Sequence, residues 1–382
     1  MSRIHQSIIS SSGVVRPTAV EVDLSILAEN FNAIRRRVGP VKVMPVLKAN
    51  AYGHGVVRVA QVMEELGAEG IGVAVLEEGI LLRESGIRIP IHVLGGVLGN
   101  QIPYFLKFGI TLTAASIEIL KQIEAAASSV KKKAKVHLKI DTGMERIGVH
   151  HYNADRFLEA AQTCRHIDVE GIFSHFANAD AADLGYARLQ LERFQEVLCF
   201  YETRGIPPPR LRHMANSGAI LQLPEAWFDM VRPGILLYGV YPSPEVKRTL
   251  PVRPALAWKS RVVYFKVIQA GSPVGYGSTW TGDHPVRAVT VPVGYGDGYF
   301  RSMSGKAMVI IRGRKYPVVG TVSMDQIVVN IESDSAYTDD EVVLIGRMGD
   351  ETITCEDLAG WAGTIPYEIL TNINTRVPRI FH

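Results

Sequence analysis

Short runs rich in β-branched residues alternate with amphipathic stretches from about residue 40 to residue 240. The amphipathic stretches place apolar residues three and four positions apart and predict helices at 56–66, 117–127, 153–164 and 188–203. The β-rich runs predict eight strands, at 43–47, 71–75, 91–94, 110–113, 136–140, 169–173, 211–213 and 230–232. This alternation favours an α/β fold, a (β/α)8 TIM barrel. Pro45 lies inside the first strand and removes a backbone donor, so we expect irregular boundaries there.

The pattern changes after Pro251, where Val, Ile, Tyr and Thr runs are separated by Gly and Pro. These runs predict strands at 261–268, 288–293, 308–311, 316–322, 327–331 and 341–345, with short helices at 355–362 and 367–374. We therefore expect a mostly β C-terminal domain at 251–382, a barrel at 16–250 and a disordered N-terminus at 1–15.

Composition narrows the classes of partner. The 382 residues are 47% hydrophobic with a net charge of +3, which gives no reason to expect nucleic acid or an anionic membrane as partner. The 3 cysteines are far apart and lack metal-ligand spacing, so we predict neither a disulfide framework nor a metal site. No secretory signal or membrane span is recognisable, and a cytoplasmic location is expected.

Chemically useful side chains collect where the predicted barrel strands end. Since the C-terminal ends of barrel strands build the active site, we expect these residues to face a ligand. The loops after strands seven and eight often bind phosphate in such barrels, so the ligand is expected to carry a phosphate. The residues are Lys48 after strand one, Lys139, Asp141 and Arg146 at strand five, His175 after strand six, Asn216 and Ser217 after strand seven, and Arg232 at strand eight.

Lys48 alone is an ordinary charged residue at a strand end, but an apolar pair precedes it and a glycine-rich stretch follows it. A lysine in an apolar barrel mouth can lose its charge and form imines. The segment VLKANAYGHG at 46–55 closely resembles the cofactor-lysine signature of alanine racemases. The resemblance continues over nearly the whole chain, through KIDTGMERIG at 139–148, FSHFA at 173–177, ANS at 215–217, VRPG at 231–234, GYGDG at 294–298, SMDQ at 323–326 and IPYE at 365–368.

The resemblance implies a pyridoxal 5′-phosphate enzyme that interconverts L-alanine and D-alanine and supplies D-alanine for peptidoglycan synthesis. Lys48 is then the lysine that forms an imine with the cofactor, and it serves as the base for the D-side proton. Tyr276, which without the resemblance is more simply a β-sheet aromatic, is implied as the second base. Arg232 is expected against the pyridine nitrogen, where a residue that keeps its proton makes the ring a weaker electron sink. His175 is expected to orient Arg232.

The remaining implied roles concern the cofactor phosphate and the substrate carboxylate. Arg146 is expected to contact the cofactor and the substrate, and Lys139 to be carbamylated so that it neutralises Arg146. The β domain of a second subunit is implied to supply Tyr276, Met324 and Asp325, so activity requires a homodimer. The expected cofactor ligands also include Tyr52, Asn216, Ser217, Tyr367 and the backbone of Gly234 and Ile235, and Asp180, Tyr295 and Tyr367 are expected to narrow the entrance.

Three alternatives stay open. Trp280 stands where tyrosine is usual in the family, so turnover of serine beside alanine is possible. A related barrel decarboxylase would use the same cofactor, but we expect that enzyme to have a carboxylate near the ring nitrogen and a catalytic cysteine late in the chain. A non-enzymatic cofactor carrier would be a single barrel without the β domain.

The GYGDG segment is not a dinucleotide fingerprint, because no βαβ context surrounds it, and it predicts a turn.

Overall fold

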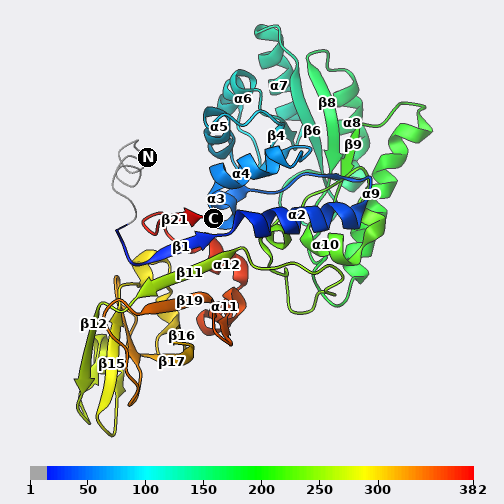
Figure 1. Ribbon diagram of the computed structural model, residues 1–382. Helices are drawn as coiled ribbons and strands as arrows, with labels where there is room; N and C mark the ends of the chain where they lie inside the picture. Colours follow the sequence, from blue (N-terminus) through cyan, green and yellow to red (C-terminus); the bar gives the residue numbers. More distant parts are fainter. Residues whose placement is uncertain (1–14) are drawn as a thin grey trace. The chain divides into compact units, whose positions relative to one another are not determined.

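The computed structural model describes residues 15–382, so the predicted disordered N-terminus lies outside the described residues apart from Val15. The chain divides into two compact units. The barrel unit comprises residues 26–51 and 55–253, and the β unit comprises the N-terminal residues up to 25, residues 52–54 and residues 254–382. Figure 1 shows the elements of both units along the chain.

The barrel unit contains the eight predicted strands. Neighbouring strands are parallel throughout, and β10 pairs with β2 through Met230 and Lys42, which closes the ring. Between β9 and β10, the N–H of Asp229 donates to the carbonyl of Arg212 at 3.0 Å. The (β/α)8 prediction is confirmed. The strands are β2 (Lys42–Val43), β3 (Ile71–Val73), β4 (Ile91–Val93), β5 (Leu112–Ala114), β6 (Ala134–Asp141), β8 (Ile167–Phe173), β9 (Leu211–His213) and β10 (Met230–Val231).

Pro45 interrupts the first barrel strand, as its missing donor predicts. Strand β2 ends at Val43, and the chain rejoins the barrel only at Val46, which forms an isolated bridge with Gly72. The carbonyl of Pro45 still accepts a hydrogen bond from the N–H of Gly72 at 2.9 Å. The proline therefore costs the ladder one donor but not its acceptor.

Helices pack against the outside of these strands with one apolar face each. Helix α8 (Ala154–Gln162), for example, buries Phe157, Leu158 and Ala161, which lie three and four positions apart. The predicted helix at 188–203 is longer, because α9 begins at Gly185. The other helices of this part of the chain are α2 (Leu24–Val38), α4 (Val56–Glu65), α5 (Leu76–Glu84), α6 (Ile102–Phe108), α7 (Ile117–Ser129) and α10 (Ser217–Gln222).

Rings fill part of the barrel interior. His92, His137, Phe173 and His213 come from β4, β6, β8 and β9, and Phe173 stacks on His213 with ring centroids 4.9 Å apart. All four side chains are buried. A barrel interior is a packed core, and here imidazoles replace branched aliphatic side chains in one layer.

The β unit is built around one large sheet in the order β12-β15-β18-β17-β16-β19-β11-β1-β21, with β20 paired to β19. Helices α11 (Cys355–Ala362) and α12 (Pro366–Asn372) follow, close to the predicted ranges. The strands are β1 (Ala19–Val22), β11 (Leu256–Arg261), β12 (Tyr264–Ile268), β15 (Val286–Val291), β16 (Met308–Ile311), β17 (Arg314–Val319), β18 (Ile327–Asn330), β19 (Glu341–Met348), β20 (Glu351–Ile353) and β21 (Arg379–Phe381), with a small hairpin of β13 (Pro273–Val274) and β14 (Trp280–Thr281).

Strand β1 belongs to this sheet. It runs antiparallel to β11, with Ala19 opposite Lys259, and parallel to β21, with Val20 opposite Arg379 (Figure 1). The expected barrel range of 16–250 therefore differs from the observed division at its N-terminal end. In the described part of the chain, no helix has the length and apolar character needed to cross a membrane.

Candidate active site

Lys48 lies at the end of the first barrel strand and is followed by a left-handed turn. Ala49, Asn50 and Ala51 have φ and ψ between 45° and 56°, and Tyr52 has φ of 51°. This conformation costs non-glycine residues roughly 1–2 kcal/mol each. Contacts from the surroundings offset part of the cost: the Glu78 carboxylate accepts from the N–H of Ala49 at 2.6 Å, and the side-chain oxygen of Asn50 accepts from the N–H of Val56 at 2.9 Å.

The environment of Lys48 favours its neutral amine. Partial burial is the largest cause that lowers the pKa of Lys48, and the positive charge of Arg146 lowers it further, while Glu78 acts in the opposite direction. Its side chain remains exposed at the barrel mouth. Only the unprotonated amine attacks a carbonyl, so these surroundings suit imine formation.

Arg232 is held by four acceptors below this mouth. Its Nη1 donates to Nδ1 of His213 at 2.7 Å, and its Nη2 donates to the carbonyls of Ser174 and Met214 and, at 3.2 Å, to Nδ1 of His175. The side chain is 3% exposed, and burial lowers the pKa of Arg232 to about 9, so the guanidinium stays charged at neutral pH. Within the described residues, no hydrogen bond uses its Nε.

A chain of imidazoles continues from Arg232 into the barrel. Because arginine only donates, Nδ1 of His213 is an acceptor, and its Nε2 carries the proton that it shares with Nδ1 of His137 at 2.7 Å. One ring nitrogen from each of His92, His137 and His213 lies within 4.8 Å of the others, a spacing that also suits a metal ion. The bond between these two rings uses the proton of His213 and the lone pair of His137, so the cluster supports Arg232 rather than offering three free lone pairs.

Ser217 and the loop after strand eight form a cluster of N–H donors. The Ser217 hydroxyl oxygen accepts from the N–H of Gly234 at 3.0 Å and from that of Leu236 at 3.3 Å. Asn216 caps α10 through its side-chain oxygen, which accepts from the N–H of Ala219 at 3.1 Å, so its observed contact is structural. Ile235 is fully buried beside these donors. Converging N–H groups and a hydroxyl suit a phosphate.

Arg146 and Lys139 occupy the same barrel end. The Asp141 carboxylate accepts from four successive backbone N–H groups, from Gly143 at 2.8 Å to Arg146 at 3.1 Å, and so fixes the loop that carries Arg146. Lys139 is 4% exposed, and its Nζ lies 4.6 Å from the ring centre of Phe173. Burial first, and then Arg232, lowers the pKa of Lys139 well below its ordinary value, with Arg146 acting in the same direction.

The electrostatics of His175 show that the predicted barrel residues converge. Burial is the largest cause that lowers its pKa, and the positive charges of Arg232, Lys139, Arg146 and Lys48 all add to the effect. Residues from the ends of strands one, five, six and eight thus lie near enough to His175 to act on one imidazole. The guanidinium groups of Arg232 and Arg146 in this site attract a ligand with a phosphate and a carboxylate.

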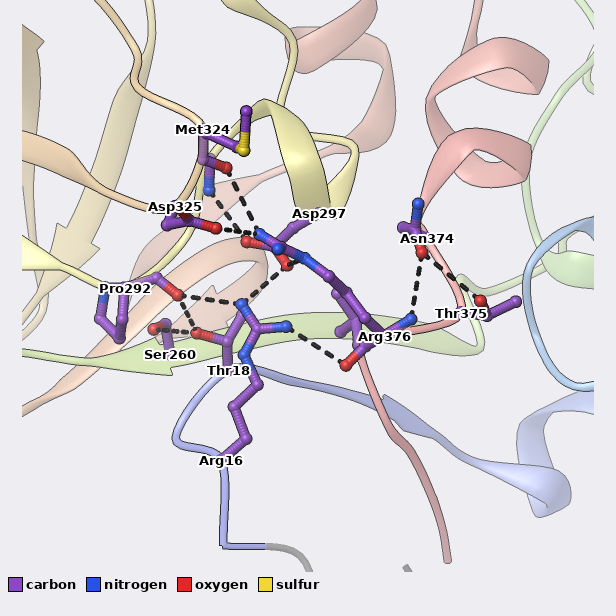
Figure 2. Close-up of polar contacts among 12 residues, drawn as sticks. Arg16, Thr18, Ser260, Pro292, Asp297, Met324, Asp325, Asn374, Thr375 and Arg376 are labelled. Atoms are coloured by element: carbon purple, nitrogen blue, oxygen red, sulfur yellow. Dashed lines mark hydrogen bonds and ion pairs between the residues drawn. The ribbon is translucent and has the colours of Figure 1, made fainter. Parts of the chain in front are cut away.

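The other predicted site residues lie in the β unit. Tyr276 is 72% exposed and Met324 is 51% exposed. Asp325 is exposed beside Met324, and Figure 2 shows both residues against Arg376. The rings of Tyr52 and Tyr367 lie 6.1 Å apart. Because these residues belong to a different unit from Lys48, their expected contributions to the cofactor, the substrate and the entrance beside Asp180 stay predictions.

Four supporting residues were missed in the sequence. His213 accepts a hydrogen bond from Arg232 and is itself bonded to His137. Glu78 accepts from the turn after Lys48, and Arg376 donates to Asp325. The available signal for His213 was its place at the end of the predicted strand 211–213, three residues before Asn216. Glu78 and Arg376 carried no local signal.

The residues present fit pyridoxal 5′-phosphate. The cofactor needs a neutral amine that can form the imine and hydrogen-bond donors for its phosphate. Its pyridine nitrogen, when unprotonated, accepts a hydrogen bond and needs one more donor. Lys48 has a lowered pKa, Ser217 lies among the N–H groups of the loop after strand eight, and Arg232 keeps its Nε without a bond in the described part of the chain. This donor set matches a cofactor whose pyridine nitrogen is unprotonated.

Comparisons with known proteins agree over the whole length. A family model described as "Alanine racemase, N-terminal domain" matches residues 22–242, and one described as "Alanine racemase, C-terminal domain" matches residues 255–381. The alanine racemase of Carboxydothermus hydrogenoformans is 43% identical over 96% of this chain and 100% of its own. The solved alanine racemase of Clostridium difficile has a TM-score of 0.91 at 37% identity, covering 97% of this chain and 96% of its own. A histidine racemase from Leuconostoc mesenteroides has a TM-score of 0.87 at 30% identity, covering 96% of this chain and 98% of its own.

Proposed function

This chain belongs to the alanine racemase family and interconverts L-alanine and D-alanine with pyridoxal 5′-phosphate, and we propose that Lys48 and Tyr276 are its two acid–base groups. The observation that carries the function is the match of both domain models and of curated relatives over almost the full chain. As in the family generally, the D-alanine formed supplies peptidoglycan synthesis.

The bound cofactor withdraws electrons from the Cα of the amino acid and so acidifies its proton. Arg232 limits this effect, because a guanidinium that stays protonated donates to the ring nitrogen without protonating it. Side reactions that need a stronger electron sink, such as transamination, are thereby suppressed. The imidazole chain through His213 and His137 keeps Arg232 in place.

Inversion at Cα needs an acid and a base on opposite faces, because a single group returns the proton to the face from which it came. Lys48 removes or returns the α-proton of D-alanine, and Tyr276 removes or returns that of L-alanine. The partial burial and the Arg146 charge that lower the pKa of Lys48 increase the share of neutral amine that can accept a proton.

The remaining residues bind and orient. Ser217, with the backbone of Gly234 and Ile235, holds the phosphate, and Asn216, Tyr52 and Tyr367 complete that site. Arg146 and the N–H of Met324, with Asp325 beside it, hold the substrate carboxylate. Donors fixed by their own hydrogen bonds bind at a lower entropic cost.

Lys139 is proposed to carry a carbamate. Carbon dioxide adds to a neutral amine and forms an N–C bond with loss of one proton, and the lowered pKa of Lys139 favours that neutral form. The product is an anion, so it replaces repulsion between Lys139 and Arg146 with attraction.

A homodimer is proposed as the active form, with the β unit of each subunit completing the barrel site of the other. Tyr276 and Met324 are exposed, as expected for residues that contact a second subunit. The edge strand β12 also exposes Tyr264, Phe265 and Val267, each more than half exposed. An uncovered apolar edge strand invites pairing or packing with another chain.

The alternatives are weaker. A barrel decarboxylase needs a carboxylate at the ring nitrogen, whereas the side-chain contacts of Arg232 are with histidines and carbonyls. A carrier would lack the β unit. Broader turnover, serine included, is a second candidate, because a neighbour of the same fold is a histidine racemase and Trp280 lies in the hairpin after Tyr276.

Incubation of the purified protein with each alanine enantiomer in deuterated water tests the function. We expect loss of the α-proton signal together with loss of optical rotation. Tyr276→Phe is expected to lose racemisation by at least about 10³-fold while Lys48 still exchanges the proton of D-alanine. Tyr337→Phe, at an exposed tyrosine of the same unit, is the control and is expected to match the wild type. Absence of exchange in the wild type would refute the function, and full racemisation by Tyr276→Phe would refute the second base.

A further inference from the structure

Asp297, in the GYGDG turn that the sequence left without a role, is fully buried between two arginines. Its Oδ1 accepts from Nε of Arg376 and pairs with Nη2 of Arg16, each at 2.7 Å (Figure 2). Its Oδ2 accepts from the N–H of Gly294 at 3.0 Å. A fully buried carboxylate is stable only with such partners, so Asp297 fixes the Arg376 side chain in one place.

Arg376 extends from this anchor to the predicted substrate loop. Its Nη2 donates to Oδ1 of Asp325 at 2.7 Å and lies 3.4 Å from the carbonyl of Met324 (Figure 2). The two nitrogens used, Nε and Nη2, lie on one edge of the guanidinium, so a single planar group joins the buried carboxylate to the exposed one. All of these residues belong to the β unit, so the arrangement holds within that unit alone.

The turn also contacts the loop directly. The N–H of Gly296 donates to the carbonyl of Met324 at 2.9 Å, and the N–H of Tyr295 donates to that of Ser323 at 3.0 Å. A Cβ on Gly294 would lie 2.2 Å from the Ser323 carbonyl oxygen, and one on Gly296 would lie 2.8 Å from Nη2 of Arg376. The glycines therefore allow a close approach that side chains would prevent.

We propose that Arg376 is a positioning residue for substrate binding, which holds the Met324–Asp325 loop and neutralises Asp325 so that a carboxylate can bind beside it. This inference rests on the proposed role of that loop. Without Arg376, the exposed Asp325 carboxylate would repel the substrate carboxylate at the same place. Arg376 itself does not touch the substrate, and its effect is on affinity.

The test compares Arg376→Met, Arg376→Lys and the double variant Arg376→Met/Asp325→Asn with the wild-type holoenzyme. Propionate, a carboxylate without an amino group, probes the site through the change in cofactor absorbance on binding, beside KM and kcat for both alanine enantiomers. For Arg376→Met we expect the propionate Kd and KM to rise about tenfold or more, with kcat and bound cofactor little changed. Arg376→Lys keeps the charge but not the two-nitrogen edge, and an intermediate effect is expected.

The double variant separates repulsion from misfolding. Removal of the unpaired carboxylate is expected to recover part of the propionate affinity that Arg376→Met loses. Arg347→Met, at an exposed arginine of β19 that pairs with Asp350, is the control and is expected to behave as wild type. An unchanged propionate Kd in Arg376→Met, or no recovery in the double variant, would overturn the inference. Failure of the proposed function would show differently, as a wild type that binds propionate but does not racemise alanine.

Discussion

Arg232 illustrates how residue type and position lead to chemistry. Its type and its place at the end of strand eight were readable from the chain, and they predicted a donor at the ring nitrogen. His175 is the expected partner and accepts a bond from Arg232 at 3.2 Å, and a second, shorter bond, at 2.7 Å, goes to His213. The second partner depends on the register of β8 against β9, where Phe173 lies opposite His213, and no local pattern encodes that register.

The buried histidines predict a pH dependence of stability. Burial lowers the pKa of His137 to about 3, and burial followed by neighbouring positive charges lowers those of His92, His175 and His213 well below the ordinary value. The folded protein therefore keeps these rings neutral, while the unfolded chain binds protons as the pH falls through about 6.5. As the pH decreases below about 6.5, the free energy of unfolding is expected to decrease by about 1.4 kcal/mol per pH unit for each such ring. For His137 this window extends down to a pH of about 3.

Urea unfolding at pH 7, 6 and 5 measures this slope. His92→Gln is expected to reduce it by the share of one ring, because His92 is 2% exposed and its one side-chain bond is to Thr113. A slope unaffected by His92→Gln would show that this ring does not contribute.

At the scale of elements, the number and order of strands were predictable and the special turn was not. The eight apolar runs allowed the barrel to be predicted, because the period and spacing of apolar residues are local properties of the chain. The left-handed segment after Lys48 consists of Ala, Asn, Ala and Tyr, none of which is glycine. It is imposed by partners such as Glu78, 29 positions away from Ala49, and so no local preference predicts it.

A glycine substitution tests the strain in this turn. Ala49 has φ of 53°, so Ala49→Gly is expected to remove a steric cost of about 1 kcal/mol, which offsets or exceeds the entropic cost of glycine. Ala125→Gly, at an exposed alanine inside the right-handed helix α7, is the matched control and is expected to destabilise by about 1 kcal/mol. Denaturant unfolding compares the two. Equal destabilisation by both variants would argue against strain at Ala49.

At the scale of the whole molecule, the sequence predicted two domains but did not predict strand β1, whose residues it counted within the barrel range. The β-rich region was expected to start after Pro251, because composition differs on its two sides, and the β unit resumes at residue 254. The residues of strand β1 show no such change of composition, since a strand of four apolar and charged residues can pair with the edge strands of many sheets. Only its pairing with β11 and β21 assigns it to the β unit.

Subunit mixing tests the proposed shared site. Lys48→Ala and Tyr276→Phe are each expected to be inactive alone. If one site takes Lys48 from one chain and Tyr276 from another, random exchange of subunits restores about one quarter of the sites, because half of the dimers are mixed and each has one intact site. Activity after mixing and sizing by light scattering are the measurements. Mixed dimers without any recovered activity would show that both residues come from the same chain.

The pairing of β1 with β21 has a consequence for biosynthesis. The barrel unit ends at residue 253 and can fold while the ribosome is still adding the rest, whereas β1 waits for β21, at 379–381, which is made long after it. Arg16 and Arg376, which share Asp297, are 360 positions apart and meet only once residue 376 has left the ribosome. The support of the loop proposed to recognise the substrate is thus completed after the barrel, so a chain that stops before residue 376 would keep a folded barrel but lose that support.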